Sequence, residues 1–431
     1  MTMAAINAAI TASLVATNSA ANSLQKSPLP PRGSFTRDVC VIGGAGHVGL
    51  PLALTFADCG LDTVIYDIDR AKLSRIAGGE MPFREHGGPE MLERALASKK
   101  LTVTDSPAPL AECRYLVLII GTPVDEHLNP GFNSIHKAID ACDPYLRDGQ
   151  TLILRSTVFP GITQHIQRYV QQKGKNISVS FCPERVAEGY SIKEFKELPQ
   201  IISAFDAETL TAVKQLFGLF CPEFVEMTPM EAELCKLMTN SWRYIQFATV
   251  NQFYMIASEN GLDFNRILHG CRHNYPRMAG MPGPGFAAGP CLLKDTMQLS
   301  AFSNNQFVLG HAAMLINEGL PQHVVNLARR AVVDEGRSGL ADKTAAILGM
   351  AFKAECDDPR DSLSYKLRKL LLLECKSVMC TDPFVWDPNF VPLEKALEAD
   401  LIFIGAPHKA YRGLKLPEGK IAVDVWNCLG K

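Results

Sequence analysis

The chain has 431 residues, a formal net charge of −2 and 47% hydrophobic residues, a composition typical of a globular protein with two or three domains. The near-neutral charge argues against binding to nucleic acid or to an anionic membrane surface. No apolar run reaches the ~18 residues that a transmembrane helix requires, so no membrane partner is expected.

The thirteen cysteines are scattered, with no CxxC pair and no spacing typical of metal ligands. This pattern indicates reduced thiols in a cytoplasmic protein without a metal site, and not a disulfide framework. Residues 1–36 are rich in Ala, Ser, Asn and Thr, and Met1–Leu14 has no charged residue. We interpret residues 1–36 as a poorly ordered leader.

A glycine-rich turn, Gly44–Gly49, follows the first expected strand (38–43) and opens an apolar helix over 50–59. In a GxGxxG turn the glycines permit a tight bend, approach of the backbone to a pyrophosphate, and close packing of helix on strand. Asp67 ends the second expected strand (62–66), where it would accept hydrogen bonds from ribose hydroxyls and repel a 2′-phosphate. The fingerprint therefore predicts NAD in preference to NADP.

Further strands are expected over 115–120, 151–155, 178–181 and 200–203, with helices between them. This alternation predicts a parallel sheet with right-handed crossovers. Ligands bind at the carboxyl ends of such strands. Hydroxyl groups follow two of these ends, in Gly121-Thr122-Pro123 and in Ser156-Thr157; ordinary turn capping is the alternative role for them.

A helix of about 30 residues is expected over 229–260, which contains neither Gly nor Pro after its first residue. That length favours a connection between domains or a dimer core. Lys236, Asn240 and Arg243 share one face of this helix. A cation on an otherwise apolar face suits an oxyanion, although a lysine whose ammonium reaches solvent would have the same pattern.

Cys291 lies behind the side-chain-poor turn that begins at Gly285, and Lys294 and Asp295 follow it. Such a cysteine becomes a nucleophile if its pKa is lowered, for which Lys294 is a candidate; an inert buried thiol is the alternative. Glu184, in a Pro-Glu-Arg sequence after an expected strand, is a candidate general base or a solvated surface carboxylate.

A second alternating unit begins at Lys343, with strands expected over 344–348, 377–380, 401–404 and 421–425 and a helix over 363–373. It predicts a second, smaller α/β domain. No GxGxxG sequence follows its first strand, so we expect it to bind something other than a second dinucleotide.

Taken in order, these motifs resemble the nucleotide-sugar 6-dehydrogenase superfamily, over about residues 37–431. The resemblance includes the sequences 349–353 (Gly-Met-Ala-Phe-Lys) and 358–362 (Asp-Pro-Arg-Asp-Ser). It implies an α/β fold with an NAD-binding Rossmann-like domain over 37–227, a central helical dimerisation and catalytic-loop region over 228–338, and a C-terminal Rossmann-like UDP-sugar-binding domain over 339–431. It also implies a homodimer or a higher homo-oligomer.

The resemblance implies a role for each motif. Cys291 would be the nucleophile, Lys236 would stabilise an oxyanion, Glu184 would serve hydrolysis, and Arg277 would reach the sugar nucleotide of a neighbouring subunit. The expected catalytic residues are Cys291, Lys236, Glu184, Asn240, Asp295 and Thr157. The expected cofactor-binding residues are Gly44, Gly46, His47, Val48, Gly49, Asp67, Gly121, Thr122, Pro123, Ser156 and Lys294. The expected substrate-binding residues are Arg185, Arg243, Arg277, Phe286, Gly289, Lys353 and Arg360.

The implied reaction is an NAD-dependent, four-electron oxidation of a UDP-sugar at C6 through a cysteine thioester, giving a precursor of surface polysaccharides. Ser241-Trp242-Arg243 and Tyr275-Pro276-Arg277 are similar to motifs of the N-acetylhexosamine branch, so UDP-N-acetylglucosamine or UDP-N-acetylmannosamine is favoured. Lys294-Asp295 is shared with UDP-glucose enzymes, and UDP-glucose is the alternative substrate. A two-electron hydroxyacid dehydrogenase, which needs no thiol, is the alternative of another class.

Overall fold

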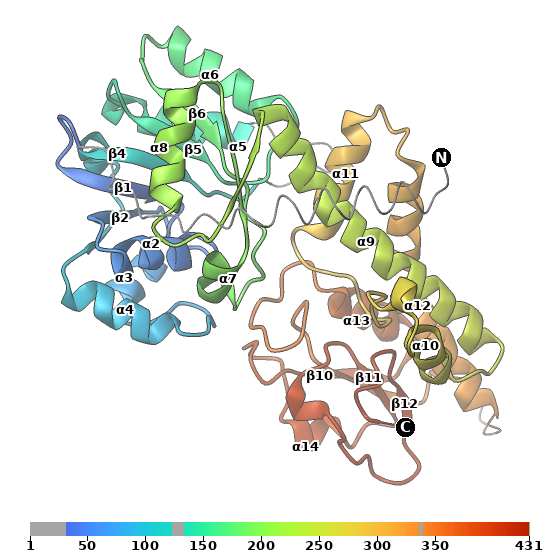
Figure 1. Cartoon of the computed structure of the whole chain (residues 1–431). Helices are drawn as coiled ribbons and strands as arrows, with labels where there is room; N and C mark the ends of the chain where they lie inside the picture. The colour runs from blue at the N-terminus through green and yellow to red at the C-terminus, as the bar shows by residue number, and fades with distance from the viewer. Residues whose placement is uncertain (1–31, 123–132, 335, 337–338, 431) are drawn as a thin grey trace, which may run out of the picture.

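The computed structural model describes residues 32–122, 133–334, 336 and 339–430. Pro123 and residues 1–31 of the expected leader lie outside them. Two sheets are present within these residues, one of eight strands and one of four (Figure 1). The strands of the first sheet are β1 (Arg37–Ile42), β2 (Thr63–Tyr66), β3 (Leu101–Thr104), β4 (Cys113–Leu118), β5 (Thr151–Leu154), β6 (Ser178–Phe181), β7 (Gln200–Ala204) and β8 (Phe224–Met227).

The first sheet has the order β3-β2-β1-β4-β5-β6-β7-β8. Its first six strands run parallel, as the alternation of strands and helices predicted. The expectation of a wholly parallel sheet is wrong at one point, because β7 pairs with β6 in the antiparallel sense. The connection between these two strands contains the short helix α7 (Ser191–Glu197).

Alternation of side chains along β1 builds a core on both faces of this sheet. Val39 and Val41 pack into one hydrophobic cluster, and Cys40 and Ile42 pack into another. Because β1 is buried on both faces, it has the continuous apolar sequence of a central parallel strand. The helices of this lobe are α2 (Gly49–Asp58), α3 (Arg70–Ala77), α4 (Gly88–Ala97), α5 (Asn133–Cys142), α6 (Ile162–Gln172), α7 and α8 (Ala207–Phe217).

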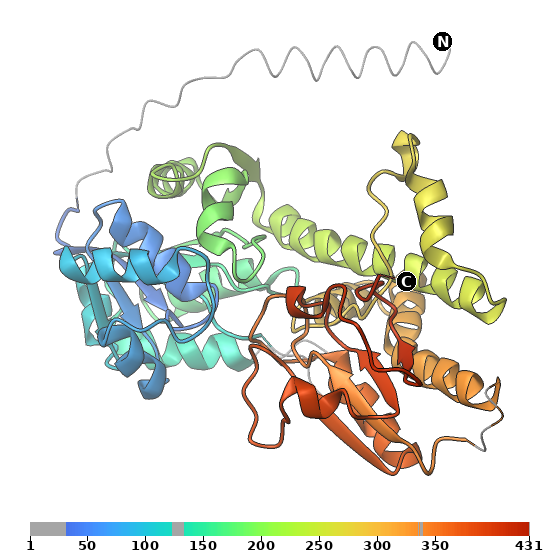
Figure 2. The same cartoon turned by 90° about the horizontal axis from the view of Figure 1, so that it is seen from below.

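Helix α9 (Pro229–Glu259) is the predicted long helix, and it runs from the N-terminal lobe toward the C-terminal lobe (Figures 1 and 2). Thr228 and Glu231 form a reciprocal capping box at its start, and Pro229 takes the first helical position. The other helices of the central region are α10 (Phe264–Arg272), α11 (Leu292–Phe302) and α12 (Val308–Asp334). Both α11 and α12 pack on α9.

The second sheet has the order β10-β9-β11-β12 and is parallel throughout. Its strands are β9 (Thr344–Leu348), β10 (Ser377–Thr381), β11 (Leu401–Ile404) and β12 (Ile421–Val423), and its helices are α13 (Leu363–Glu374) and α14 (Leu393–Ala396). This is the smaller α/β unit that the sequence predicted.

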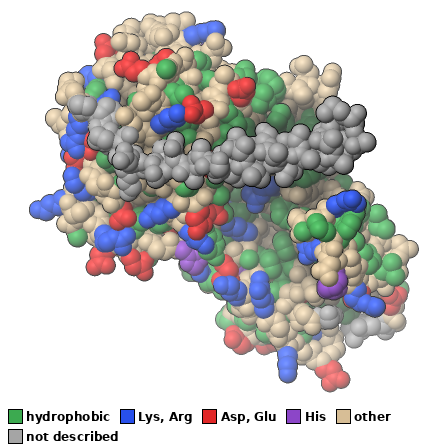
Figure 3. Space-filling view, viewed as in Figure 1, with side chains coloured by type: hydrophobic (Ala, Val, Ile, Leu, Met, Phe, Trp, Pro, Cys, Tyr) green, Lys and Arg blue, Asp and Glu red, His purple; other side chains and the backbone are tan. Residues whose placement is uncertain are grey.

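The surface is mixed in charge. Acidic and basic side chains are interspersed over the face seen in Figure 3, in keeping with a formal net charge of −2. Among the helices of the described residues, none combines the length and the apolar character needed to cross a membrane.

Candidate active site

A cavity of about 440 Å³ opens beside the glycine-rich turn. Its walls come from both lobes, because the loop of residues 357–360 of the C-terminal lobe faces the turn. Gly43, Gly46, His47, Val48 and Gly49 line it on one side, and Lys72, Pro82, Phe83, Ile119, Ile120, Gly121, Glu188, Asp357, Asp358, Pro359 and Arg360 complete it. Of the turn residues expected to bind the cofactor, Gly46, His47, Val48 and Gly49 thus line one cavity, and Gly44 does not.

The turn fits a bound pyrophosphate. A Cβ on Gly46 would have only the Gly43 carbonyl within 4 Å, so the missing side chain leaves the backbone open toward the cavity. The tight bend itself lies one residue earlier than expected, at Gly43, whose φ is +78°, while Gly44 is packed against Val41. Gly49 allows the start of α2 to approach the turn, as predicted.

Asp67 holds the turn from the end of β2. One carboxylate oxygen accepts a hydrogen bond from the Ala45 amide at 2.9 Å, and the other accepts one from Asp69 at 3.0 Å. Each oxygen keeps a second lone pair. Asp67 is therefore placed to order the glycine-rich turn and can still accept a hydrogen bond from a ribose.

A second cavity, of about 330 Å³, contains the predicted cysteine. Its lining comes from the catalytic loop, α9 and the C-terminal lobe. The lining residues are Arg185, Val186, Ala187, Glu188, Lys236, Asn240, Arg243, Phe247, Phe286, Ala287, Ala288, Gly289, Pro290, Cys291, Leu292, Phe352, Lys353, Ala354, Pro407 and Trp426. The structure therefore brings together Cys291, Lys236 and Asn240, which are up to 55 residues apart in the sequence.

Cys291 is the N-cap residue of α11, and its side chain is accessible from the cavity. Burial raises the pKa of its thiol and Asp295 raises it further, while Lys294 and Lys236 act in the opposite direction. Lys294 lowers the pKa of the thiol, as expected, but the two lysines together do not outweigh the effect of burial. The net effect is a Cys291 thiol whose pKa lies above its ordinary value.

A chain of polar contacts links the thiol region to the N-terminal lobe. Asn240 donates to Asp295 at 2.6 Å, and Lys294 lies 3.4 Å from the same carboxylate, which is fully buried. Lys294 also donates to the Thr122 hydroxyl at 3.3 Å, and Thr122 in turn donates to the Thr157 carbonyl at 2.7 Å. Five of the predicted site residues thus position one another through these contacts.

Ser156 has a structural role in this geometry. Its hydroxyl accepts from the Ile120 amide at 2.7 Å and donates to the Ile120 carbonyl at 2.8 Å. It thereby fixes the end of β4 where Ile119 and Ile120 line the cofactor cavity.

Lys236 is 8% exposed and lies on the α9 face that lines the thiol cavity. Within the part of the chain that the structure describes, it has no carboxylate or hydrogen-bond partner. A buried ammonium without a counter-ion is costly, and it is stabilised when an anion enters the site. This arrangement fits an oxyanion that forms near the thiol.

Glu184 does not line the thiol cavity. Its carboxylate forms an ion pair with the fully buried Arg155 and accepts hydrogen bonds from the amides of Arg185 and Val186. These contacts hold it at a separate small pocket. Contrary to the expectation from the sequence, Glu184 and Cys291 therefore do not line the same cavity. The carboxylate of Glu184 is bound instead by Arg155, which directly follows β5, and by the amides of the two residues after Glu184.

Glu188, four residues later, lines both the cofactor cavity and the thiol cavity. Burial, followed by the nearby charge of Asp358, raises the pKa of its carboxyl to about 7. One of its carboxylate oxygens is buried with no hydrogen-bond partner among the described residues. In the sequence, the position of Glu188 three residues after the Pro-Glu-Arg motif could have marked it as a candidate. Which of the two glutamates lines the cavities can be decided only from the folded structure.

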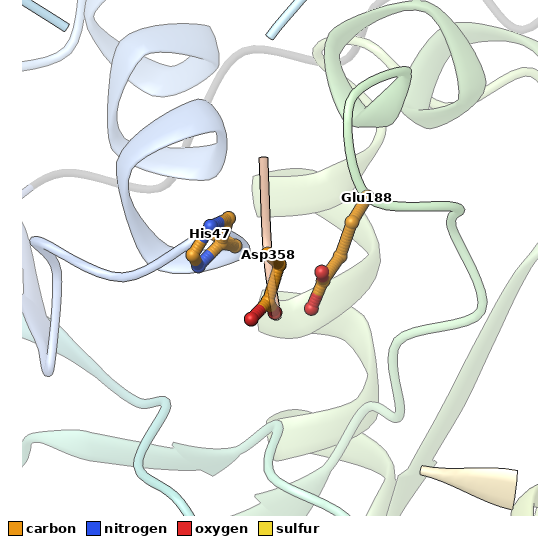
Figure 4. A group of neighbouring side chains, drawn as sticks. All are labelled: His47, Glu188 and Asp358. Atoms are coloured by element: carbon orange, nitrogen blue, oxygen red, sulfur yellow. The ribbon is translucent and has the colours of Figure 1, made fainter. Parts of the chain in front are cut away.

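Glu188 lies beside His47 and Asp358 (Figure 4). A ring nitrogen of His47 and a carboxylate oxygen of each acid are all within 4.8 Å of one another. Arg360 supplies positive charge here, at 2.5 Å from Asp358 and 3.6 Å from Glu188. His47 stacks on Phe83, and burial lowers the pKa of its imidazole to about 4. His47 is therefore neutral at physiological pH.

The expected substrate residues separate into three groups. Arg185, Arg243, Phe286, Gly289 and Lys353 line the thiol cavity. Arg360 lies instead in the wall of the cofactor cavity. Arg277 is exposed and donates to the Tyr275 hydroxyl at 3.2 Å, and it lines neither cavity of its own chain.

The fold and the paired cavities define a dinucleotide-dependent dehydrogenase with a thiol in its second site. Three domain models of the UDP-glucose/GDP-mannose dehydrogenase family match the chain: the NAD binding domain over 37–221, the central domain over 230–318 and the UDP binding domain over 346–431. The chain belongs to this family. It is an NAD-dependent dehydrogenase of UDP-sugars, as the sequence resemblance implied.

Individual relatives agree. A UDP-N-acetyl-D-mannosamine dehydrogenase of Methanocaldococcus jannaschii is 29% identical over 411 residues, covering 91% of this chain and 93% of the relative. The structure of a UDP-D-ManNAc dehydrogenase from Pyrococcus horikoshii superposes with a TM-score of 0.84 at 27% identity, covering 90% and 94% of the two chains. A UDP-glucose dehydrogenase from Pyrobaculum islandicum superposes with a TM-score of 0.83 at 26% identity, covering 92% and 95%.

Proposed function

We propose that this enzyme oxidises the C6 hydroxyl of a UDP-N-acetylhexosamine to the carboxylate, with UDP-N-acetylmannosamine as the first candidate. The sugar is suggested by relatives that carry that name and match over nine-tenths of both chains. One observation above all supports the chemistry: Lys236, which is buried and has no carboxylate partner among the described residues, faces the same cavity as the accessible thiol of Cys291.

The residues divide the work of two successive oxidations. When bound, NAD would supply the oxidising power, one NAD accepting the first hydride and a second NAD, taken up after the first NADH has left, accepting the second; the Gly43–Gly49 turn would hold the pyrophosphate of each. After the first oxidation the Cys291 sulfur adds to the aldehyde carbon, and the Lys236 ammonium stabilises the oxygen that becomes negatively charged. The second oxidation converts this thiohemiacetal to a thioester, which water hydrolyses to the acid. Covalent attachment keeps the aldehyde from escaping between the two steps.

Glu188 is our candidate for the base that activates the hydrolytic water, in place of Glu184. Its raised pKa of about 7 suits a group that takes up a proton near neutral pH, and it lies between the two cavities. Asn240 and Asp295 would hold the thiol loop and the water, Thr157 would position them through Thr122, and Lys353 and Arg243 would face the diphosphate.

UDP-glucose remains the second candidate substrate, because the UDP-glucose dehydrogenase named above has almost the same structural similarity. A panel of UDP-N-acetylmannosamine, UDP-N-acetylglucosamine and UDP-glucose, assayed for NADH, tests the assignment. We expect two NADH per sugar and the highest kcat/KM with an N-acetylhexosamine. A preference for UDP-glucose would overturn the sugar assignment, and one NADH per substrate would indicate an ordinary two-electron dehydrogenase.

The domain limits that we propose are 37–227, 228–338 and 339–431; the matched family domains, 37–221, 230–318 and 346–431, each fall within one of these ranges and support the proposal. We also propose a homodimer that pairs through α9. Met238, Trp242, Phe253 and Ile256 fall on one face of this helix and are 53%, 61%, 44% and 55% exposed. Exposed apolar side chains gathered on one helix face in this way are typical of an interface. Light scattering should show a dimer that Trp242→Glu dissociates; a monomeric parent protein would exclude it.

A further inference from the structure

The loop that follows β9 carries two side chains of the thiol cavity, Phe352 and Lys353. Lys353 donates to the Glu188 carbonyl at 2.5 Å, which joins the C-terminal lobe to the N-terminal one. The Phe352 ring packs on the catalytic loop at Gly289, where a Cβ would lie 2.5 Å from the ring. The position of residues 349–355 therefore determines where the Lys353 ammonium and the Phe352 ring lie in the wall of the thiol cavity.

Two buried polar side chains flank this loop. In the sheet order β10-β9-β11-β12, Asp382 follows β10 and His408 comes after β11, so they approach the loop from the strands on either side. Their side chains have no exposed surface. Neither residue lines the cofactor cavity or the thiol cavity.

Asp382 holds the near end of the loop. Its Oδ2 accepts hydrogen bonds from the amides of Met350 at 2.6 Å and Ala351 at 3.0 Å, and lies 3.2 Å from His408 Nε2. Its Oδ1 accepts from the amides of Phe384 and Val385. Burial alone would raise the pKa of this carboxyl, but the hydrogen bond from His408 and those from the backbone amides hold the pKa below its ordinary value.

His408 holds the far end of the loop. Its Nδ1 accepts a hydrogen bond from the Glu355 amide at 3.0 Å, so the proton of a neutral ring lies on Nε2, which donates to Asp382. The imidazole therefore connects Glu355 to the same carboxylate that binds Met350 and Ala351. The loop is fixed at both ends by one pair of side chains.

We propose that Asp382 and His408 are positioning residues for nucleotide binding: by fixing residues 349–355 they hold Lys353 where it meets the diphosphate of the UDP-sugar. The proposal rests on the proposed function, in which Lys353 faces that diphosphate. Neither Asp382 nor His408 touches the substrate in this account, and their effect passes through the loop.

Three substitutions of one residue separate the two hydrogen bonds. His408→Gln can keep the donor to Asp382, His408→Asn can keep the acceptor for Glu355, and His408→Leu removes both. The probe is UDP, and its Kd is measured by calorimetry on the full chain, with NAD titrated in parallel. We expect His408→Leu to weaken UDP binding at least tenfold, the two polar variants to fall between it and the parent protein, and NAD binding to change less than twofold.

Two comparisons distinguish positioning from simple destabilisation. His323 is a second buried histidine, on α12, where it hydrogen-bonds to Ser258; His323→Leu should lower the melting temperature without changing the Kd for UDP. If His408 acts through Lys353, the double variant Lys353→Ala/His408→Leu should bind UDP no more than twofold more weakly than Lys353→Ala alone.

An unchanged Kd for UDP in His408→Leu would overturn the proposal, as would additive losses in the double variant. Should the leucine variant fail to fold, the same criterion applies to the asparagine and glutamine variants. Because UDP carries no sugar, these outcomes do not depend on which hexose is oxidised, so an error in the sugar assignment would be recognised separately in the UDP-sugar panel.

Discussion

At Cys291 opposing influences act on one thiol. Burial and Asp295 raise its pKa, and Lys294 and Lys236 lower it, with a net increase. The sign is that of an acid whose charged form is disfavoured: the raised pKa makes the Cys291 thiolate less populated at a given pH than the thiolate of an ordinary cysteine. We therefore expect the Cys291 sulfur to attack the aldehyde carbon in the same step in which the thiol loses its proton.

The rate of alkylation of Cys291 by iodoacetamide should accordingly increase with pH, with a midpoint above that of an ordinary cysteine near 8.5. Asp295→Asn removes one of the raising charges, so its midpoint should be lower than that of the parent protein. Peptide mapping by mass spectrometry follows the single site. A midpoint below 8 in the parent protein would contradict the balance of charges described here.

Glu188 and Glu184 give a second test at the residue scale. Glu188→Gln should lower turnover by roughly 10²–10⁴ because it removes the proposed base. Glu184→Gln breaks a buried ion pair with Arg155 instead, and should lower the free energy of unfolding by about 3–5 kcal/mol. The two variants are compared by active-site-normalised turnover and by denaturant unfolding. Loss of turnover in Glu184→Gln alone would restore that residue as the base.

At the scale of elements, the catalytic loop depends on two glycines that face aromatic rings. Gly289 has a φ of +98° and would place a Cβ 2.5 Å from Phe352, and Gly285 would place one 2.1 Å from Trp426. The turn before the thiol is therefore packed on the C-terminal lobe, and side chains are excluded there for lack of space.

Gly289→Ala should cost about 1–3 kcal/mol of stability and reduce turnover at least tenfold, because the thiol loop must move away from Phe352. Gly60→Ala is the matched control: its φ is +89°, and no atom of the described residues lies within 4 Å of a Cβ built there. Thermal unfolding and NADH production measure the two effects. Equal behaviour of both variants would mean that the packing against Phe352 is unimportant.

Sequence reasoning predicted the elements whose local pattern is strong. The glycine-rich turn, the long helix α9 and the second α/β unit all follow from spacing and apolar runs. The strand expected over 115–120 spans Cys113–Leu118 instead, and the apolar run continues past its end through Ile119 and Ile120, which line the cofactor cavity. Strands β3 and β8 have four residues each and were missed, and α12 contains Gly310, Gly319 and Pro321, which obscure its helical pattern.

The sequence predicted most of the residues that line the thiol cavity, but not all the contacts that they make. Cys291, Lys236 and Asn240 meet as expected, because the motifs that carry them face one cavity. Glu188 replaces Glu184 as the proposed base because Arg155 binds the Glu184 carboxylate. Arg155 follows another strand, β5, and no local sequence pattern associates it with Glu184. Contacts of this kind arise only when the chain has folded.

At the scale of the whole molecule, the C-terminal lobe closes the cofactor cavity. Asp357 accepts a hydrogen bond from the Arg84 amide at 3.0 Å, and the Arg84 guanidinium lies 3.5 Å from the centre of the Phe384 ring. The same lobe brings Lys353 to the thiol cavity. One lobe thus forms walls of both cavities, so that a nucleotide sugar and NAD can be held together while Glu188 lies between them.

The central claim is that both oxidations occur on one sugar because Cys291 holds it between them, and the Cys291→Ser enzyme tests this most directly. Serine can form a hemiacetal and an ester, but an ester is more resonance-stabilised than a thioester and its alkoxide leaves less readily. With UDP-N-acetylmannosamine and NAD, we expect a folded variant whose turnover collapses and whose intact mass shows a covalently linked sugar. A Cys291→Ser enzyme that releases two NADH per sugar at close to the parent rate would contradict the thiol mechanism.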